Sequence, residues 1–223
     1  MKKIKKLLAI IAILAMPALA EAQSFNGGLI AGGVITQVNG DGYGGFHQAG
    51  FTGGGFINLP FGQCSAFQLE LKYSMFGSHS SATEADPLLG NGHKYKLRLN
   101  YIELPLMYQY SLTKLRIGQQ SLSFITLEIG LSLDYLFSYK DETDDVPNTQ
   151  ADWLKFSATG NVGVHFNLTH GLGINIRYMN SILPIRVKKT GDVTGRYLDY
   201  RNNYFNIVLQ ATLTYTIGAS KNK

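Results

Sequence analysis

Cysteine is almost missing from this 223-residue sequence, in which Cys64 stands alone. A single cysteine cannot form an intramolecular disulfide, so a disulfide framework is excluded. Only 16% of the residues are charged, yet nothing after residue 22 approaches the run of about eighteen apolar residues that a transmembrane helix requires. The fold must therefore be organised by something other than disulfides or membrane-spanning helices.

The first 22 residues have the pattern of a secretory signal peptide. Lysines at positions 2, 3, 5 and 6 precede an apolar run from Leu7 to Met16, which is too short to span a bilayer comfortably. Small residues follow, and Ala20-Glu21-Ala22 is the favoured cleavage site, with Ala18-Leu19-Ala20 as the alternative. We expect residues 1–22 to be cleaved and residues 23–223 to form one domain.

Most of the positive charge belongs to this leader. Its removal takes away four lysines and one glutamate and lowers the formal net charge from +5 to +2. The basic balance of the whole chain therefore gives no support to nucleic-acid binding, and we expect no nucleic-acid partner.

The remaining chain consists of segments in which apolar and polar residues alternate, as in a β-strand with two different faces. The longest, residues 121–139, sets seven apolar side chains, from Ile125 to Phe137, against polar or small residues. The pattern predicts eight strands, at residues 25–37, 50–61, 66–77, 97–110, 121–139, 153–168, 172–183 and 204–217.

The fourth of these segments, LRLNYIELPLMYQY at 97–110, is the most informative. From Ile102 onward its even positions are apolar, whereas Lys96, Arg98 and Asn100 have the same parity and are polar. Either a bulge lies near Tyr101, or this end of the strand stands in water above an apolar zone. Pro105 removes a backbone donor and is tolerable in a strand at a bulge or local bend.

The connections between the predicted strands alternate in length. Those after the first, third, fifth and seventh strands are long, at residues 38–49, 78–94, 140–152 and 184–203. Those after the second and sixth are tight, and the link at 111–120 is intermediate. An up-and-down membrane barrel with short turns at one end and long loops at the other predicts this asymmetry.

Three features favour a membrane barrel over a soluble, lipocalin-like barrel, in which the apolar face would point inward. Aromatic residues gather toward the strand ends, the apolar face lacks charge in the middle of every strand, and the polar face is rich in Gly, Ser, Thr and Asn. We predict an all-β, eight-stranded antiparallel up-and-down transmembrane β-barrel, monomeric and located in the cell outer membrane.

Eight ionisable residues fall on the polar face of their strands: Glu70, Lys72, Glu103, Glu128, Asp134, Lys155, His165 and Arg177. The interior of an eight-stranded barrel is just wide enough for side chains, and buried charges need partners. We therefore expect a structural network of salt bridges that plugs the lumen. A proton or ion relay is the functional alternative.

Catalysis, cofactors and metals are not expected. A hydrolase would need a Ser, Cys or acid pair with a histidine near a membrane edge, and His47, His79 and His93 in predicted loops are the candidates for this alternative. An acidic cluster at 141–145 and basic residues at 186–201 match no metal-binding motif. Solvated loops explain both clusters, with a surface Ca²⁺ or lipopolysaccharide phosphates as the alternatives.

Three segments carry a family resemblance: YIELPLMYQY at 101–110, FQLELKYSMFG at 67–77 and FTGGGFINLPF at 51–61. They resemble the PorT-like outer-membrane β-barrel family of the Bacteroidota, and YIELPL is the specific part. The resemblance implies an eight-stranded outer-membrane barrel, and the family's namesake is an accessory of the type IX secretion system. Its shared residues are scaffold residues, so they transfer no functional site.

These observations favour a non-enzymatic scaffold or interaction protein, a candidate accessory in envelope biogenesis or protein secretion. The expected partners are outer-membrane lipid and lipopolysaccharide, together with envelope or secretion-system proteins. The rival hypotheses are a narrow channel and a lipid-modifying barrel enzyme.

Overall fold

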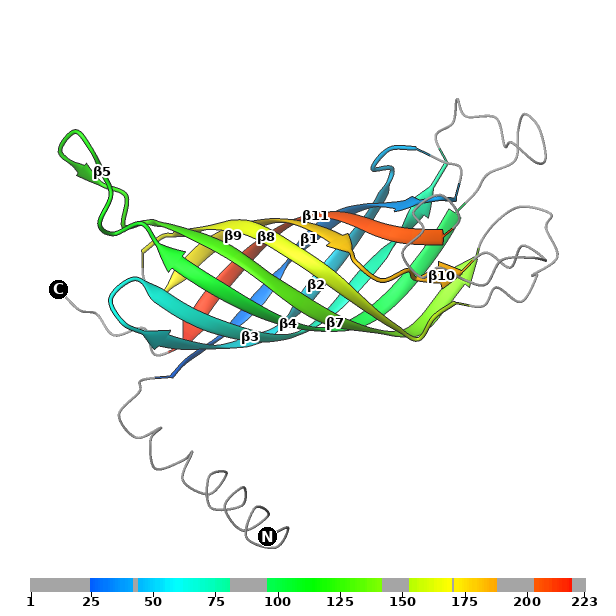
Figure 1. Ribbon diagram of the computed structural model, residues 1–223, viewed down its shortest axis with the longest axis horizontal. Helices are drawn as coiled ribbons and strands as arrows, with labels where there is room; N and C mark the ends of the chain where they lie inside the picture. Colours follow the sequence, from blue (N-terminus) through cyan, green and yellow to red (C-terminus); the bar gives the residue numbers. More distant parts are fainter. Residues whose placement is uncertain are drawn as a thin grey trace, which may run out of the picture.

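The computed structural model describes residues 25–41, 44–80, 96–141, 153–169, 171–187 and 203–217. Eight long antiparallel strands form a closed barrel (Figure 1): β1 (Asn26–Asn39), β2 (Gln48–Phe61), β3 (Ser65–His79), β4 (Lys96–Ser111), β7 (Ile125–Asp141), β8 (Phe156–Asn167), β9 (Leu172–Ser181) and β11 (Asn203–Ile217). Each pairs with the next, and β1 pairs with β11 to close the wall. The predicted fold is confirmed. The predicted signal peptide lies outside the described residues.

The two ends of the barrel differ. Gly27 of β1 pairs with Ile217 of β11, so the first and last strands begin and end together at what we call the turn end. The same end carries the tight turn at 62–64, the turn at 168–171 and a small hairpin, β5 (Arg116–Ile117) and β6 (Gln120–Ser121). The other connections leave from the opposite end of the barrel, which we call the loop end. There β10 (Arg186–Val187) pairs with β11.

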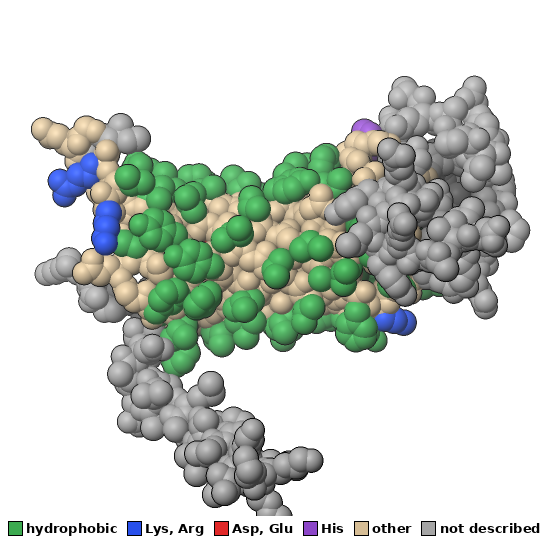
Figure 2. Space-filling model, viewed as in Figure 1, with side chains coloured by type: hydrophobic (Ala, Val, Ile, Leu, Met, Phe, Trp, Pro, Cys, Tyr) green, Lys and Arg blue, Asp and Glu red, His purple; other side chains and the backbone are tan. Residues whose placement is uncertain are grey.

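Apolar side chains cover the outside of the wall, and Figure 2 shows them along the barrel with Lys and Arg only at its ends on the face in view. Leu71, Leu131 and Leu213 are each at least 60% exposed. Rings gather toward both ends, with Phe61 stacked on Phe67 at the turn end and Phe51 against Tyr73 nearer the loop end. A soluble barrel would bury these residues, so the lipocalin-like alternative is wrong.

The structure resolves the alternatives for β4. Lys96, Arg98 and Asn100 do face outward with Ile102, beyond the exposed apolar zone, and a register shift also occurs at Tyr101. There β7 carries the extra residue, because Asn100 pairs with Ser138 and Tyr101 with Leu136. Among the described residues, no helix is long and apolar enough to cross a membrane.

Pro105 lies in β4 without a register shift. Its neighbour β3 pairs with β4 up to Leu69–Leu106 and again from Lys72–Glu103, and the ladder is interrupted between these pairs. On the other side Pro105 pairs in register with Ser132 of β7. The missing proline N–H is therefore accommodated by a local gap in one ladder.

Candidate functional site: the barrel interior

Arg177 lies at the centre of a charged layer inside the barrel. Its two terminal nitrogens donate to the two carboxylate oxygens of Glu70 at 2.6 and 2.8 Å, and its Nε donates to Glu128 at 3.0 Å. All three side chains are completely buried. Because β3 and β9 are not neighbours in the wall, the Arg177–Glu70 pair crosses the lumen and connects opposite sides of the barrel.

Lys72 extends this layer toward β4 and β11. Its Nζ lies 3.6 Å from Glu70 and 3.5 Å from Glu103, and it donates to Gln210 at 3.0 Å. Amide side chains complete the layer, since Gln109 and Asn175 donate to Glu128 at 2.7 and 2.6 Å. Charge-assisted hydrogen bonds of this kind are the strong ones in a low-dielectric interior.

Glu103 and Asp134 form a second acidic feature in the same layer. They are register partners on β4 and β7, so two carboxyl groups lie on adjacent strands on the inner face. Ser132 and Thr159 donate hydroxyl hydrogens to Asp134, and Ser74 donates to Glu103. The Oε1 atom of Glu103 is buried without a hydrogen-bond partner among the described residues.

The other two predicted network residues are placed differently. His165 is partly exposed at 13% and lies 3.6 Å from Glu128 through Nδ1, with Nε2 3.3 Å from the Thr214 hydroxyl. Lys155 is exposed, because β8 begins only at Phe156 and the chain bends before it. The assignment of Lys155 to the lumen is therefore wrong.

An apolar layer, which the sequence analysis missed, fills the interior nearer the loop end. It is a cluster of buried residues: Val34, Val38, Phe76, Leu97, Leu99, Tyr101, Leu136, Trp153, Met179, Ile185 and Val208. The available signal was parity, since Leu97, Leu99 and Tyr101 share the inward parity of Glu103. The interior is thus polar toward the turn end and apolar toward the loop end.

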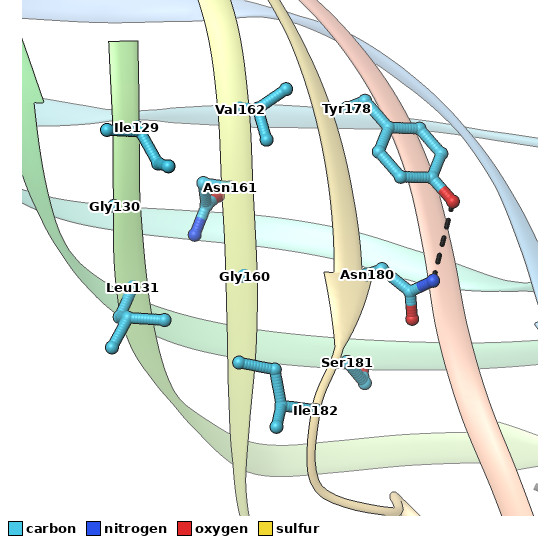
Figure 3. Close-up of a pocket in the computed structure, with 10 residues that line it drawn as sticks. All are labelled: Ile129, Gly130, Leu131, Gly160, Asn161, Val162, Tyr178, Asn180, Ser181 and Ile182. Atoms are coloured by element: carbon cyan, nitrogen blue, oxygen red, sulfur yellow. Dashed lines mark hydrogen bonds between the residues drawn. The ribbon is translucent and has the colours of Figure 1, made fainter.

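A groove of about 530 Å³ lies on the lipid-facing side of β7, β8 and β9 (Figure 3). Gly160 leaves it open between Ile129, Leu131 and Ile182, and the Asn180 amide donates to the Tyr178 hydroxyl at 3.4 Å across its rim. No carboxylate, imidazole, amine or thiol lines the described groove. Ser181 lines it, but no base to activate this hydroxyl is among the described lining residues.

Two of the three loop histidines considered for hydrolysis lie together. His47 and His79 line one small cavity at the loop end, whereas His93 lies outside the described residues. Within the described part of the chain, no three His, Cys, Asp or Glu residues are grouped so that they could hold a metal ion. The acidic cluster lies outside the described residues from position 142 onward, as do the basic residues from 188 to 201.

The closed barrel, its apolar exterior and its charged interior define an outer-membrane β-barrel protein. The sequence matches the outer membrane protein beta-barrel domain family over residues 21–186, and the chain belongs to that family. A comparison with curated protein sequences finds no match.

Three solved structures are similar to this chain at low sequence identity. Ail, the attachment invasion locus protein of Yersinia pestis, solved with the heparin analogue sucrose octasulfate, has 13% identity and a TM-score of 0.44, covering 87% of this chain and 99% of its own. Neisserial surface protein A has 13% identity and a TM-score of 0.43, with coverages of 86% and 97%. The outer membrane protein AlkL has 13% identity and a TM-score of 0.37, with coverages of 88% and 93%.

Proposed function

We propose that this outer-membrane barrel is a closed, non-enzymatic scaffold whose exposed connections contact other envelope components. The observation that carries the proposal is the filled interior, in which the Arg177 ion pairs span the lumen and the apolar layer lies beyond them. Side chains that fill a barrel of this size at two levels oppose an aqueous pore. The functional contacts are then made by the connections at the two ends of the barrel.

The hairpin at the turn end is the best candidate for a protein contact. Figure 1 shows it extending beyond the barrel wall, unlike the tight turn at 62–64. Leu115, directly before β5 at the base of the hairpin, is 53% exposed between Lys114 and Arg116, which are also exposed. An apolar side chain flanked by two cations suits a partner with an acidic, partly apolar surface. The PorT-like resemblance makes an envelope-biogenesis or secretion component the partner class that we propose.

A photo-crosslinking amino acid tests this proposal. Placed at Leu115 in intact cells, it should give a discrete protein adduct that is lost when Lys114 and Arg116 are both changed to Gln. Placed at Leu131, which is 60% exposed on the apolar wall, it should label only lipid. Equal protein labelling at positions 115 and 131 would contradict a specific contact, as would an adduct that persists when Lys114 and Arg116 are both changed to Gln.

A narrow channel is the second candidate, and one observation favours it. Buried polar atoms of Asn161, Asn175, Gln210 and Thr212, on β8, β9 and β11, have no protein hydrogen-bond partner among the described residues. Buried polar atoms of this kind are commonly bonded to internal water. Single-channel recordings on the purified protein decide between the two functions, because a closed scaffold gives no conductance steps, whereas a channel gives steps that change in Gln210→Leu.

A further inference from the structure

A basic cavity lies on the outer face of the barrel at the loop end. It has a volume of about 340 Å³ and is lined by residues of three adjacent strands and the turn before them: His47, Gln48, Ala49, Met75, His79, Lys96 and Arg98. Register places His79 opposite Lys96 and Gly77 opposite Arg98. Gly77 and Ala49 contribute little or no side chain, which leaves the space between the longer residues open.

The ionisable side chains that line this cavity are all basic. Two fixed cations and two imidazoles line it, and no carboxylate is among its described lining residues. Lys140 of β7 pairs in register with Arg98 and adds a third cation on the neighbouring strand. Lys96 and Arg98 each have another interaction of their own, but lysine carries three donor hydrogens and arginine five, so each can serve more than one acceptor.

The position of the cavity along the barrel axis indicates which part of the bilayer it faces. On the same strands, toward the middle of the barrel, lie Phe51, Tyr73 and, beyond Asn100, Ile102, which belong to the outward-facing apolar zone. Figure 2 shows the hydrophobic surface ending near the loop end. A bilayer has its headgroups directly beyond such an aromatic zone. The cavity therefore faces the headgroup layer of the outer leaflet.

We propose that this cavity binds the phosphate headgroup of a phosphorylated glycolipid in the outer leaflet. Arginine matches phosphate oxygens with its planar donor fork, lysine adds a point charge, and each imidazole adds an N–H donor. The lipid's acyl chains would continue along the exposed apolar side chains below. This site is independent of the scaffold role, because it needs only the membrane position and the cavity.

The chain supplies a matched control. The tripeptide Lys-Leu-Arg occurs at 96–98 beside the cavity and again at 114–116 in the hairpin at the opposite end. Native mass spectrometry in a zwitterionic detergent would measure binding of bis-phosphorylated lipid A to three proteins: the unchanged chain, Lys96→Gln/Arg98→Gln and Lys114→Gln/Arg116→Gln. We expect about thirtyfold weaker binding for the first pair, roughly fivefold for each cation at an anionic lipid surface, and no change for the second.

Four further measurements make the test decisive. Gel mobility with and without boiling reports folding, and His47→Gln/His79→Gln, which leaves Lys96 and Arg98 intact, should weaken binding by less than the 96/98 double substitution does. Fully dephosphorylated lipid A should bind poorly, and inorganic phosphate alone should not displace the intact lipid. Three results would each overturn the proposal. They are equal lipid A binding by the 96/98 and 114/116 double variants, binding of dephosphorylated lipid A as tight as that of the phosphorylated form, and displacement of the lipid by free phosphate.

Discussion

The two halves of the barrel interior solve the same packing problem with different chemistry. Toward the turn end, Arg177, Glu70 and Glu128 fill the lumen with ion pairs; toward the loop end, Phe76, Leu99 and their neighbours fill it with hydrocarbon. Charged groups must find partners of specific geometry, whereas apolar groups need only volume and contact. The polar half therefore fixes which strands face each other, and the apolar half closes the lumen at the end nearer the loops.

The largest effect is expected from breaking the polar half at its centre. Arg177→Met leaves Glu70 and Glu128 buried without their main partner, and we expect a loss of about 3–5 kcal/mol in the free energy of unfolding. Urea unfolding in lipid vesicles, followed by the fluorescence of Trp153, measures it. Arg116→Met in the exposed hairpin is the control and should change stability by less than about 0.5 kcal/mol. Equal effects would mean that the ion pairs contribute nothing to stability.

The apolar half is tested by Leu99→Ala. Leu99 is fully buried, and the cavity left behind should cost about 2–5 kcal/mol in the same unfolding measurement. Leu104→Ala lies on the outer face of the same strand, where lipid fills the space that the side chain leaves, so its cost should be smaller. A cost at position 104 equal to that at 99 would argue against a packed apolar layer.

A smaller effect, a gain in stability, is expected where two carboxyl groups lie on paired strands in the polar half. Asp134→Asn removes one of two carboxyl groups on paired strands, and an asparagine amide brings a donor toward Glu103. We expect a gain of up to about 1 kcal/mol in unfolding free energy. Glu128→Gln should instead lose stability, because Glu128 binds Arg177 and accepts from Gln109 and Asn175. Destabilisation by both changes would show that Asp134 is held as firmly as Glu128.

The smallest expected effect is the difference in stability between removing a hydrogen-bonded hydroxyl and removing an unbonded one in the polar half. The Thr52 hydroxyl donates to the Tyr73 carbonyl at 3.1 Å, whereas the buried Thr212 hydroxyl has no partner among the described residues. Thr52→Val should cost about 1 kcal/mol, and Thr212→Val should cost nothing or stabilise slightly. Equal costs in thermal unfolding would indicate that water satisfies Thr212.

Much of the wall was predictable because alternation is a local property. Residues 127–137 show one face to lipid and the other to the lumen, and no distant residue is needed to see it. Strand ends were less predictable, since β8 begins at Phe156 and β9 ends at Ser181 for reasons of pairing across the wall. That error also misplaced Lys155, which has inward parity but lies before the strand begins.

The sequence by itself determined the alternation, the asymmetry of the connections and the set of ionisable residues on the polar face, because each depends on spacing along one strand. Only the tertiary structure decided that Arg177 reaches Glu70 across the lumen, that Leu97 and Leu99 join an apolar layer, and that two histidines meet Lys96 and Arg98 in one cavity. Those contacts join residues that are distant in sequence, and they depend on closure of the barrel and the register of its strands, which no local pattern encodes.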